Sequence, residues 1–128
     1  MAIFNKKKKK ILYVDDSEVD LDLVENMLQD FYTVLPSKSG QEALDFLLRN
    51  DSINLILLDL IMPEMDGFET FSRIKDLGTM SHIPIAFLTS SKEENDQAQA
   101  EKLGAADYIL KPYTQKELLT RIKNIIGN

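Results

Sequence analysis

Residues 53–67 constrain the fold more than any other stretch of the chain. Four consecutive apolar residues, 55–58, indicate a strand that is buried on both faces, as strands in parallel sheets are. Asp59 ends this strand, and Pro63 and Gly67 make the chain turn soon afterwards. In open parallel sheets the ligand crevice lies beyond the carboxyl ends of the strands. Asp59 is therefore a candidate site residue, although on this stretch alone a helix-capping role is equally well supported.

The rest of the chain alternates strands with helices. We predict strands at residues 11–14, 32–35, 55–58, 84–88 and 108–110, with the second one stopped by Pro36. Helices follow each strand, with Ser17 and Ser39 as N-caps of the first two, and Gly78 ends the third. Short connections between strands and helices favour right-handed crossovers. The fold class is thus α/β, a doubly wound five-stranded parallel sheet with helices on both faces.

The apolar residues of the expected helices recur at helical spacing. The inward positions are predicted to be Leu23, Val24, Met27, Leu28 and Phe31; Ala43, Leu44, Leu47 and Leu48; Phe68, Phe71 and Ile74; and Leu118, Leu119, Ile122, Ile125 and Ile126. Residues 92–102 carry little apolar surface, so we expect that helix to be the least firmly docked.

Composition excludes several classes of protein. The chain has 128 residues, enough for one domain, and no cysteine, so disulfides and thiolate chemistry are absent and a reducing cytoplasm is the expected location. It has no secretory signal and no apolar run long enough to cross a membrane. The net charge is −6, and without Lys6–Lys10 the remaining ten basic and 21 acidic residues give −11. Such a body repels nucleic acid, so we interpret residues 1–9 as a solvated basic lead-in and disfavour a nucleic-acid-binding arm.

Polar residues stand at the carboxyl ends of four strands. Asp15 and Asp16 follow the first, Asp59 the third, Thr89 the fourth and Lys111 the fifth. In a parallel sheet all of them project into one crevice, where three carboxylates repel one another unless a cation compensates them. Mg²⁺ prefers carboxylate oxygens and retained water, so the pattern indicates a magnesium site.

This constellation suits phosphoryl transfer. Asp59 would be the nucleophile that forms an aspartyl phosphate, Mg²⁺ and Lys111 would neutralise the phosphoryl oxygens, and Thr89 would donate a hydrogen bond. Each residue alone has an ordinary structural interpretation, as a cap, a turn former or a surface lysine. The single histidine, His82, precedes the fourth strand at the opposite edge and is not expected to be a ligand; without cysteine, zinc is disfavoured.

Four motifs at family-like spacing carry a resemblance. They are residues 11–17 (ILYVDDS), 59–67 (DLIMPEMDG), 87–90 (FLTS) and 104–112 (GAADYILKP). With them the chain resembles the CheY-like receiver domain of two-component response regulators, which we place at residues 10–128. The resemblance implies strand order 2-1-3-4-5 and phosphorylation of Asp59 by a histidine kinase or a histidine phosphotransfer protein.

The resemblance also implies roles for individual residues. Asp16, Asp59 and the backbone carbonyl of Ile61 would bind Mg²⁺ directly, Asp15 would act mainly through water, and the Lys111–Pro112 bond would be cis. The family pattern is complete at its five catalytic positions, so we expect a phosphorylatable receiver whose only chemistry is its own phosphorylation and slow dephosphorylation.

The resemblance further implies a switch. The Thr89 hydroxyl would move toward the phosphoryl group, and the ring of Tyr108 would rotate into the vacated space. The face formed by the fourth helix, fifth strand and fifth helix would then bind a downstream protein target or effector domain, or a second copy in a homodimer.

Two other classes share parts of this pattern. Magnesium-dependent phosphatases of the haloacid dehalogenase type use an Asp nucleophile but need a second Asp two residues later, where this chain has Ile61. Flavodoxin-like cofactor binders share the fold, but Asp15 and Asp16 would repel a cofactor phosphate. We expect a stand-alone receiver or the N-terminal part of a larger regulator. Residues 83–85 and 106–109 resemble the corresponding residues of receivers that precede cyclic-di-nucleotide enzymes.

Overall fold

The computed structural model describes residues 7–50 and 52–127 and contains one five-stranded parallel sheet. The sheet has the order β2-β1-β3-β4-β5, which confirms the predicted fold class and strand order. Because the order reverses beside β1, the crevice of the sheet opens at the carboxyl ends of β1 and β3. The strands are β1 (Lys10–Val14), β2 (Thr33–Ser37), β3 (Leu55–Leu58), β4 (Ile85–Thr89) and β5 (Asp107–Leu110).

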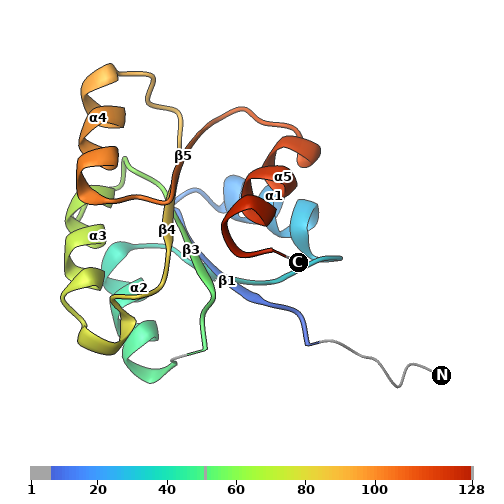
Figure 1. Ribbon diagram of the computed structural model, residues 1–128, viewed down its shortest axis with the longest axis horizontal. Helices are drawn as coiled ribbons and strands as arrows, with labels where there is room; N and C mark the ends of the chain where they lie inside the picture. Colours follow the sequence, from blue (N-terminus) through green and yellow to red (C-terminus); the bar gives the residue numbers. More distant parts are fainter. Residues whose placement is uncertain (1–6, 51, 128) are drawn as a thin grey trace.

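Helices cover both faces of the sheet (Figure 1). On one face lie α2 (Gly40–Arg49), α3 (Gly67–Lys75) and α4 (Glu94–Leu103), and on the other α1 (Glu18–Leu28) and α5 (Gln115–Ile126). A short 3₁₀ helix, η1 (Gly78–Met80), precedes β4. The apolar core is accordingly divided by the sheet into two clusters, one under each helical layer.

Several predicted element boundaries differ from the observed ones, and two of the differences have a clear physical reason. Strand β2 does not stop before Pro36 but continues to Ser37. The reason is that β2 is an edge strand, where a residue without an N–H group can face the free side of the sheet. Helix α3 ends at Lys75 rather than at Gly78, which has a φ of 66° and opens the 3₁₀ helix.

Three predicted inward positions are exposed: Leu23 and Phe31 each at 44% and Leu48 at 69%. Helix α1 instead turns Leu21, Val24 and Leu28 toward the sheet, which points Leu23 sideways. Phe31 lies beyond the end of this helix. Leu48 points away from the inner face of α2, because consecutive side chains of a helix point in different directions and Leu47 lies on that face.

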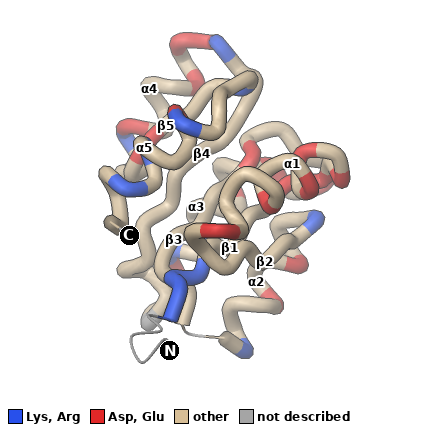
Figure 2. The backbone as a smooth tube through the Cα atoms, turned by 90° about the vertical axis from the view of Figure 1, so that its right-hand side faces the viewer, with Lys and Arg blue, Asp and Glu red and all other residues tan. Residues whose placement is uncertain are grey.

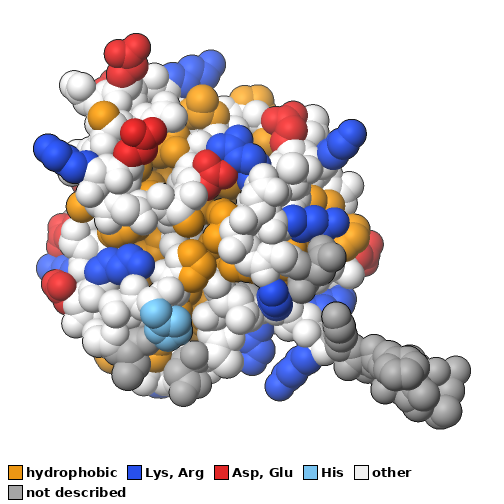
Figure 3. Space-filling model, viewed as in Figure 1, with side chains coloured by type: hydrophobic (Ala, Val, Ile, Leu, Met, Phe, Trp, Pro, Cys, Tyr) orange, Lys and Arg blue, Asp and Glu red, His pale blue; other side chains and the backbone are white. Residues whose placement is uncertain are grey.

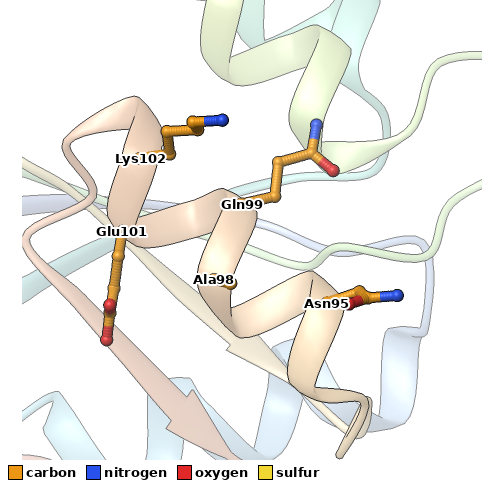
Figure 4. Close-up of a pocket in the computed structure, with 5 residues that line it drawn as sticks. All are labelled: Asn95, Ala98, Gln99, Glu101 and Lys102. Carbon is orange, nitrogen blue, oxygen red and sulfur yellow. The ribbon is translucent and has the colours of Figure 1, made fainter.

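Helix α4 is attached by the least apolar surface, as expected. Ala100 is its one buried residue, whereas every other α-helix buries at least two. Figure 4 shows the polar character of its outer surface, where Asn95, Gln99 and Lys102 point to one side and Glu101 to the other. Little hydrophobic free energy therefore opposes a displacement of α4.

Two lysines of the basic lead-in, Lys8 and Lys9, are not merely solvated. The Lys8 ammonium donates to the carbonyl of Gln29 at the end of α1 (2.8 Å), and that of Lys9 donates to the carbonyl of Ile126 at the end of α5. Lysines at helix C-termini satisfy orphan carbonyls and complement the helix dipole. The lead-in thus helps to fasten both helices of this layer, whereas Lys6 and the residues before it lie outside the described residues. Among the described helices, none has the length and hydropathy of a membrane span.

Candidate functional site

Backbone hydrogen bonds carry the strand pairing one residue beyond the strands and align the site residues. The N–H of Asp59 donates to Val14 O, and the N–H of Lys111 donates to Thr89 O, each at 2.9 Å. The residues that follow β3 and β5 are thereby held at one edge of the sheet. The Lys111–Pro112 bond is cis, as the resemblance implied.

Three carboxylates meet at this edge. Asp15, Asp16 and Asp59 each offer an oxygen, and these oxygens lie within 4.8 Å of one another. Asp15 and Asp59 are buried, whereas Asp16 is exposed and leaves the group accessible. Hard oxygen donors at this separation fit a divalent cation such as Mg²⁺. Ile61 lies in the loop between β3 and α3 with its side chain 63% exposed.

The acceptor candidate Asp59 is electrostatically perturbed. Its pKa is raised from 3.8 to about 7, mainly because burial disfavours the charged form; Lys111 lowers this pKa and the nearby Asp15 charge contributes to the rise. The backbone N–H groups of Leu60 and Ile61 also donate to the carboxyl group and favour its charged form. The site thus holds a carboxylate that is poorly solvated by water but supplied with fixed donors.

Lys111 links the carboxylates through its ammonium group. The nitrogen lies 2.8 Å from Asp15 Oδ2, 2.9 Å from Asp20 Oδ2 and 3.9 Å from Asp59 Oδ2. Its side chain is 17% exposed. Although burial opposes the charge, the hydrogen bonds to Asp15 and Asp20 leave the pKa of Lys111 raised, so the lysine is a cation at every relevant pH.

Thr89 is fully buried at the end of β4 and is connected to the loop that follows. Its Oγ1 accepts a hydrogen bond from the N–H of Ser91 (3.2 Å), and the Ser91 hydroxyl donates to Asp96 in α4 (2.6 Å). The Tyr108 hydroxyl donates to the carbonyl of Ser91 (2.9 Å). Thr89, the loop, α4 and β5 therefore form one connected network.

The position of Tyr108 differs from the expected sequence of events. We expected the ring of Tyr108 to become buried only after Thr89 moves, but in this structure Tyr108 is already buried, with 9% of its surface exposed. Its ring centre lies 6.3 Å from that of Phe87. The physical reason is that Ser91 O gives the phenol a hydrogen-bond partner inside the loop. In this conformation, burial of Tyr108 is not a step that remains to be made.

Three residues of the site were not predicted from the sequence. The Tyr13 hydroxyl donates to Asp15 Oδ2 (2.5 Å) from the buried middle of β1, and Asp20 binds Lys111 from the first turn of α1. A Cβ at Gly67 would lie 2.4 Å from Asp59 O, so only glycine lets α3 begin against the acceptor strand. Tyr13 had a readable signal, since a tyrosine within an aliphatic buried strand needs a polar partner; Asp20 had none.

His82 lies away from this site. It is exposed in the segment before β4, at the amino ends of the strands, where Figure 3 shows the single histidine on the surface. The expectation that it plays no part in the site agrees with this placement.

Three converging carboxylates, a lysine and a buried threonine lie at the carboxyl ends of the strands of a doubly wound parallel sheet. The chain is therefore an α/β protein with an acidic site at this edge of the sheet. Residues 11–123 match the family model of the response regulator receiver domain. The chain belongs to this family, whose members serve two-component signalling and interact with histidine kinases and effectors.

Known proteins support the assignment. The chain is 37% identical over 118 residues to the transcriptional regulatory protein CpxR of Escherichia coli, covering 91% of this chain and 49% of CpxR. It is 36% identical over 118 residues to a probable cyclic di-GMP phosphodiesterase of Vibrio cholerae, covering 92% of this chain and 26% of the relative. The chain thus spans half or less of these curated relatives.

Solved structures agree in fold. The chemotaxis protein CheY4 of Vibrio cholerae superposes with a TM-score of 0.87 at 28% identity, covering 93% of this chain and 99% of that one. The receiver domain of the sensor histidine kinase PA1611 of Pseudomonas aeruginosa, solved with a magnesium ion in its active-site cleft, gives 0.85 at 28% identity, covering 95% and 100%. The cluster of three carboxylates in the present chain, Asp15, Asp16 and Asp59, is consistent with Mg²⁺ binding.

Proposed function

We propose that this receiver accepts a phosphoryl group on Asp59 from the phosphohistidine of a histidine kinase or a histidine phosphotransfer protein. The observation that carries the proposal is the position of Asp59, buried at the end of β3 with the Lys111 ammonium 3.9 Å away and donors from Leu60 and Ile61. A carboxylate held among fixed donors in a dry site is equipped to meet the charge of a phosphoryl group.

The reaction is a displacement at phosphorus. One oxygen of ionised Asp59 forms a bond to the phosphorus, the P–N bond to the donor histidine breaks, and the imidazole leaves with that electron pair and takes up a proton. Asp16, Asp59 and the carbonyl of Ile61 would hold Mg²⁺, with Asp15 acting through water. The ion would neutralise charge on the carboxylates and on the transferred oxygens. Lys111 contributes a fixed positive charge to the same oxygens.

The output follows from the network behind Thr89. A phosphoryl group on Asp59 adds strong acceptors that attract the Thr89 hydroxyl, which now accepts from the N–H of Ser91. Movement of Thr89 therefore disturbs the Ser91 loop, to which Asp96 of α4 and Tyr108 are bonded. Because α4 is weakly docked, we propose that the displacement reaches the α4-β5-α5 face.

The α4-β5-α5 face is the proposed partner surface. Figure 3 views it directly, with apolar side chains gathered between the charged groups of the two helices, and Leu103 and Leu110 are among its exposed hydrophobic residues. A downstream protein target, an effector domain or a second copy would bind there. We propose residues 10–128 as the receiver and residues 1–9 as its lead-in.

The test is covalent labelling. With Mg²⁺ and a small acyl-phosphate donor, the protein should gain one phosphoryl group that is labile to base and hydroxylamine. Asp59→Asn should gain none, whereas Asp22→Asn, which changes an exposed carboxylate of α1, should label as the wild type does. Chelation of the metal should stop labelling. Undiminished labelling of Asp59→Asn would refute the assignment.

A further inference from the structure

The Lys111 ammonium is bound more closely to two other carboxylates than to the proposed acceptor. It lies 2.8 Å from Asp15 and 2.9 Å from Asp20 but 3.9 Å from Asp59. An ammonium group has three N–H donors, and two of them are occupied by these short hydrogen bonds. Only one donor is left for the oxygens of a group on Asp59.

Asp20 is held firmly in this position. The Ser17 side chain caps α1 by accepting from the N–H of Asp20 (3.3 Å), and the N–H of Ser17 in turn donates to Asp15 Oδ1 (2.9 Å). Asp20 is therefore connected to the carboxylate pocket through its backbone as well as through Lys111. Its side chain is 31% exposed, so its charge is only partly screened by water.

Asp20 adds a fourth negative charge at a site that already carries three carboxylates. Figure 2 shows acidic residues along α1 beside the carboxyl end of β1. Asp22 stands two positions further along the same helix and is exposed. Asp20 thus differs from a nearby carboxylate of the same helix in one decisive respect, its ion pair with Lys111.

We propose that Asp20 is a positioning residue of the acceptor site, which holds the Lys111 ammonium back from Asp59 and competes with the phosphoryl group for it. The proposal rests on the proposed function of Asp59. An aspartyl phosphate must draw Lys111 toward itself against the attraction of Asp20. The same negative charge acts in the opposite direction on a cation, because it strengthens the field that attracts Mg²⁺.

These two effects give the proposal a signature of opposite signs. Asp20→Asn keeps the shape of the side chain and removes its charge. Affinity for a phosphoryl mimic should then rise about threefold to tenfold, as for a partly exposed ion pair of about 1 kcal/mol. Affinity for Mg²⁺ should fall about twofold to fivefold, since one nearby charge is lost. A purely structural role of Asp20 would weaken both affinities together.

The experiment uses the full chain and two titrations. Mg²⁺ is titrated by calorimetry in the absence of other ligands, and beryllofluoride is titrated at saturating Mg²⁺ as the phosphoryl mimic. Asp22→Asn is the matched control, because it removes the same charge from the same helix without touching Lys111. Asp20→Ala is a second variant, which also removes the amide oxygen through which asparagine would still accept from the lysine. Thermal unfolding of each variant verifies that it is folded.

Stronger beryllofluoride binding with weaker Mg²⁺ binding in both Asp20 variants, and neither change in Asp22→Asn, is the result expected. Equal effects of the Asp20 and Asp22 variants would overturn the proposal, and so would a loss of both affinities in folded Asp20 variants. Wild-type protein that binds no beryllofluoride would instead contradict the proposed function of Asp59. The two failures are therefore distinguishable.

Discussion

Replacing Asp59 by asparagine removes a buried charge from the end of β3 while preserving the size of the side chain. Burial raises the pKa of Asp59 from its ordinary 3.8 to about 7 in the folded protein. The folded state therefore binds this proton more tightly than the unfolded state does. The resulting stabilisation is fully present below the unfolded pKa, and it is lost as the pH rises through the folded pKa. Asparagine imitates the protonated form at every pH.

The magnitude follows from the separation of the two pKa values. Each pH unit between 3.8 and about 7 corresponds to ~1.36 kcal/mol, so ionisation of Asp59 costs about 4 kcal/mol of unfolding free energy by pH 8. This is a large fraction of the ~5–15 kcal/mol that stabilises a typical domain. Asp59→Asn should therefore be more stable than the metal-free wild type at pH 8, by several kcal/mol.

The assay is urea unfolding of both proteins in a chelating buffer between pH 4.5 and 8.5. The informative quantity is the difference in unfolding free energy between variant and wild type, because titrations that the two share, such as that of Asp107 with its lowered pKa, cancel in it. The difference should increase from about pH 4.5 to pH 7 and then level off. Parallel stability curves would show that Asp59 titrates normally and would refute the reasoning. Saturating Mg²⁺ should stabilise the wild type much more than the variant.

Two further predictions concern the loops and the lead-in. Ile61 is exposed beside the acceptor and cannot orient a water molecule, and the Ser91 hydroxyl donates to Asp96. The double substitution Ile61→Asn and Ser91→Glu should therefore shorten the lifetime of the phosphoryl group several-fold. An equal or longer lifetime in a phosphate-release assay would reject this account. Lys9→Met should lower the unfolding free energy by about 0.5–1 kcal/mol, because the carbonyl of Ile126 loses its charged donor, whereas Lys7→Met should change it little in the same urea titration.

The positions of the site residues were predictable for two reasons: the sequence pattern shows where each strand ends, and the parallel topology places these ends side by side. A buried run that ends in Asp59 predicts a strand, and parallel strands bring their carboxyl ends to one edge. Lys111 and Asp15 follow by the same rule, since each comes directly after an apolar run, and their side chains do meet. The convergence needed no knowledge of side-chain conformation.

What escaped prediction depends on rotation and on packing. Helical spacing leaves several residues as candidates for the inner face, and only the docking of α1 decides that Leu21 is buried and Leu23 exposed. The enclosed position of Tyr108 depends likewise on a hydrogen bond to a loop carbonyl that has no sequence signature. The contact between Tyr13 and Asp15, by contrast, could have been predicted from the sequence, because side chains two residues apart in a strand point to the same side.

The contact between Tyr13 and Asp15 supplies a physical reason why Asp15 is proposed to act on Mg²⁺ through water while Asp16 and Asp59 bind it directly. Asp15 Oδ2 accepts from the Tyr13 hydroxyl at 2.5 Å and from Lys111 at 2.8 Å, while Oδ1 accepts from the N–H of Ser17 at 2.9 Å. Donors on both oxygens leave this carboxylate little freedom to turn toward a cation. Asp16 is exposed. An indirect role of Asp15 through water, with direct ligation left to Asp16 and Asp59, is therefore the arrangement that these hydrogen bonds favour.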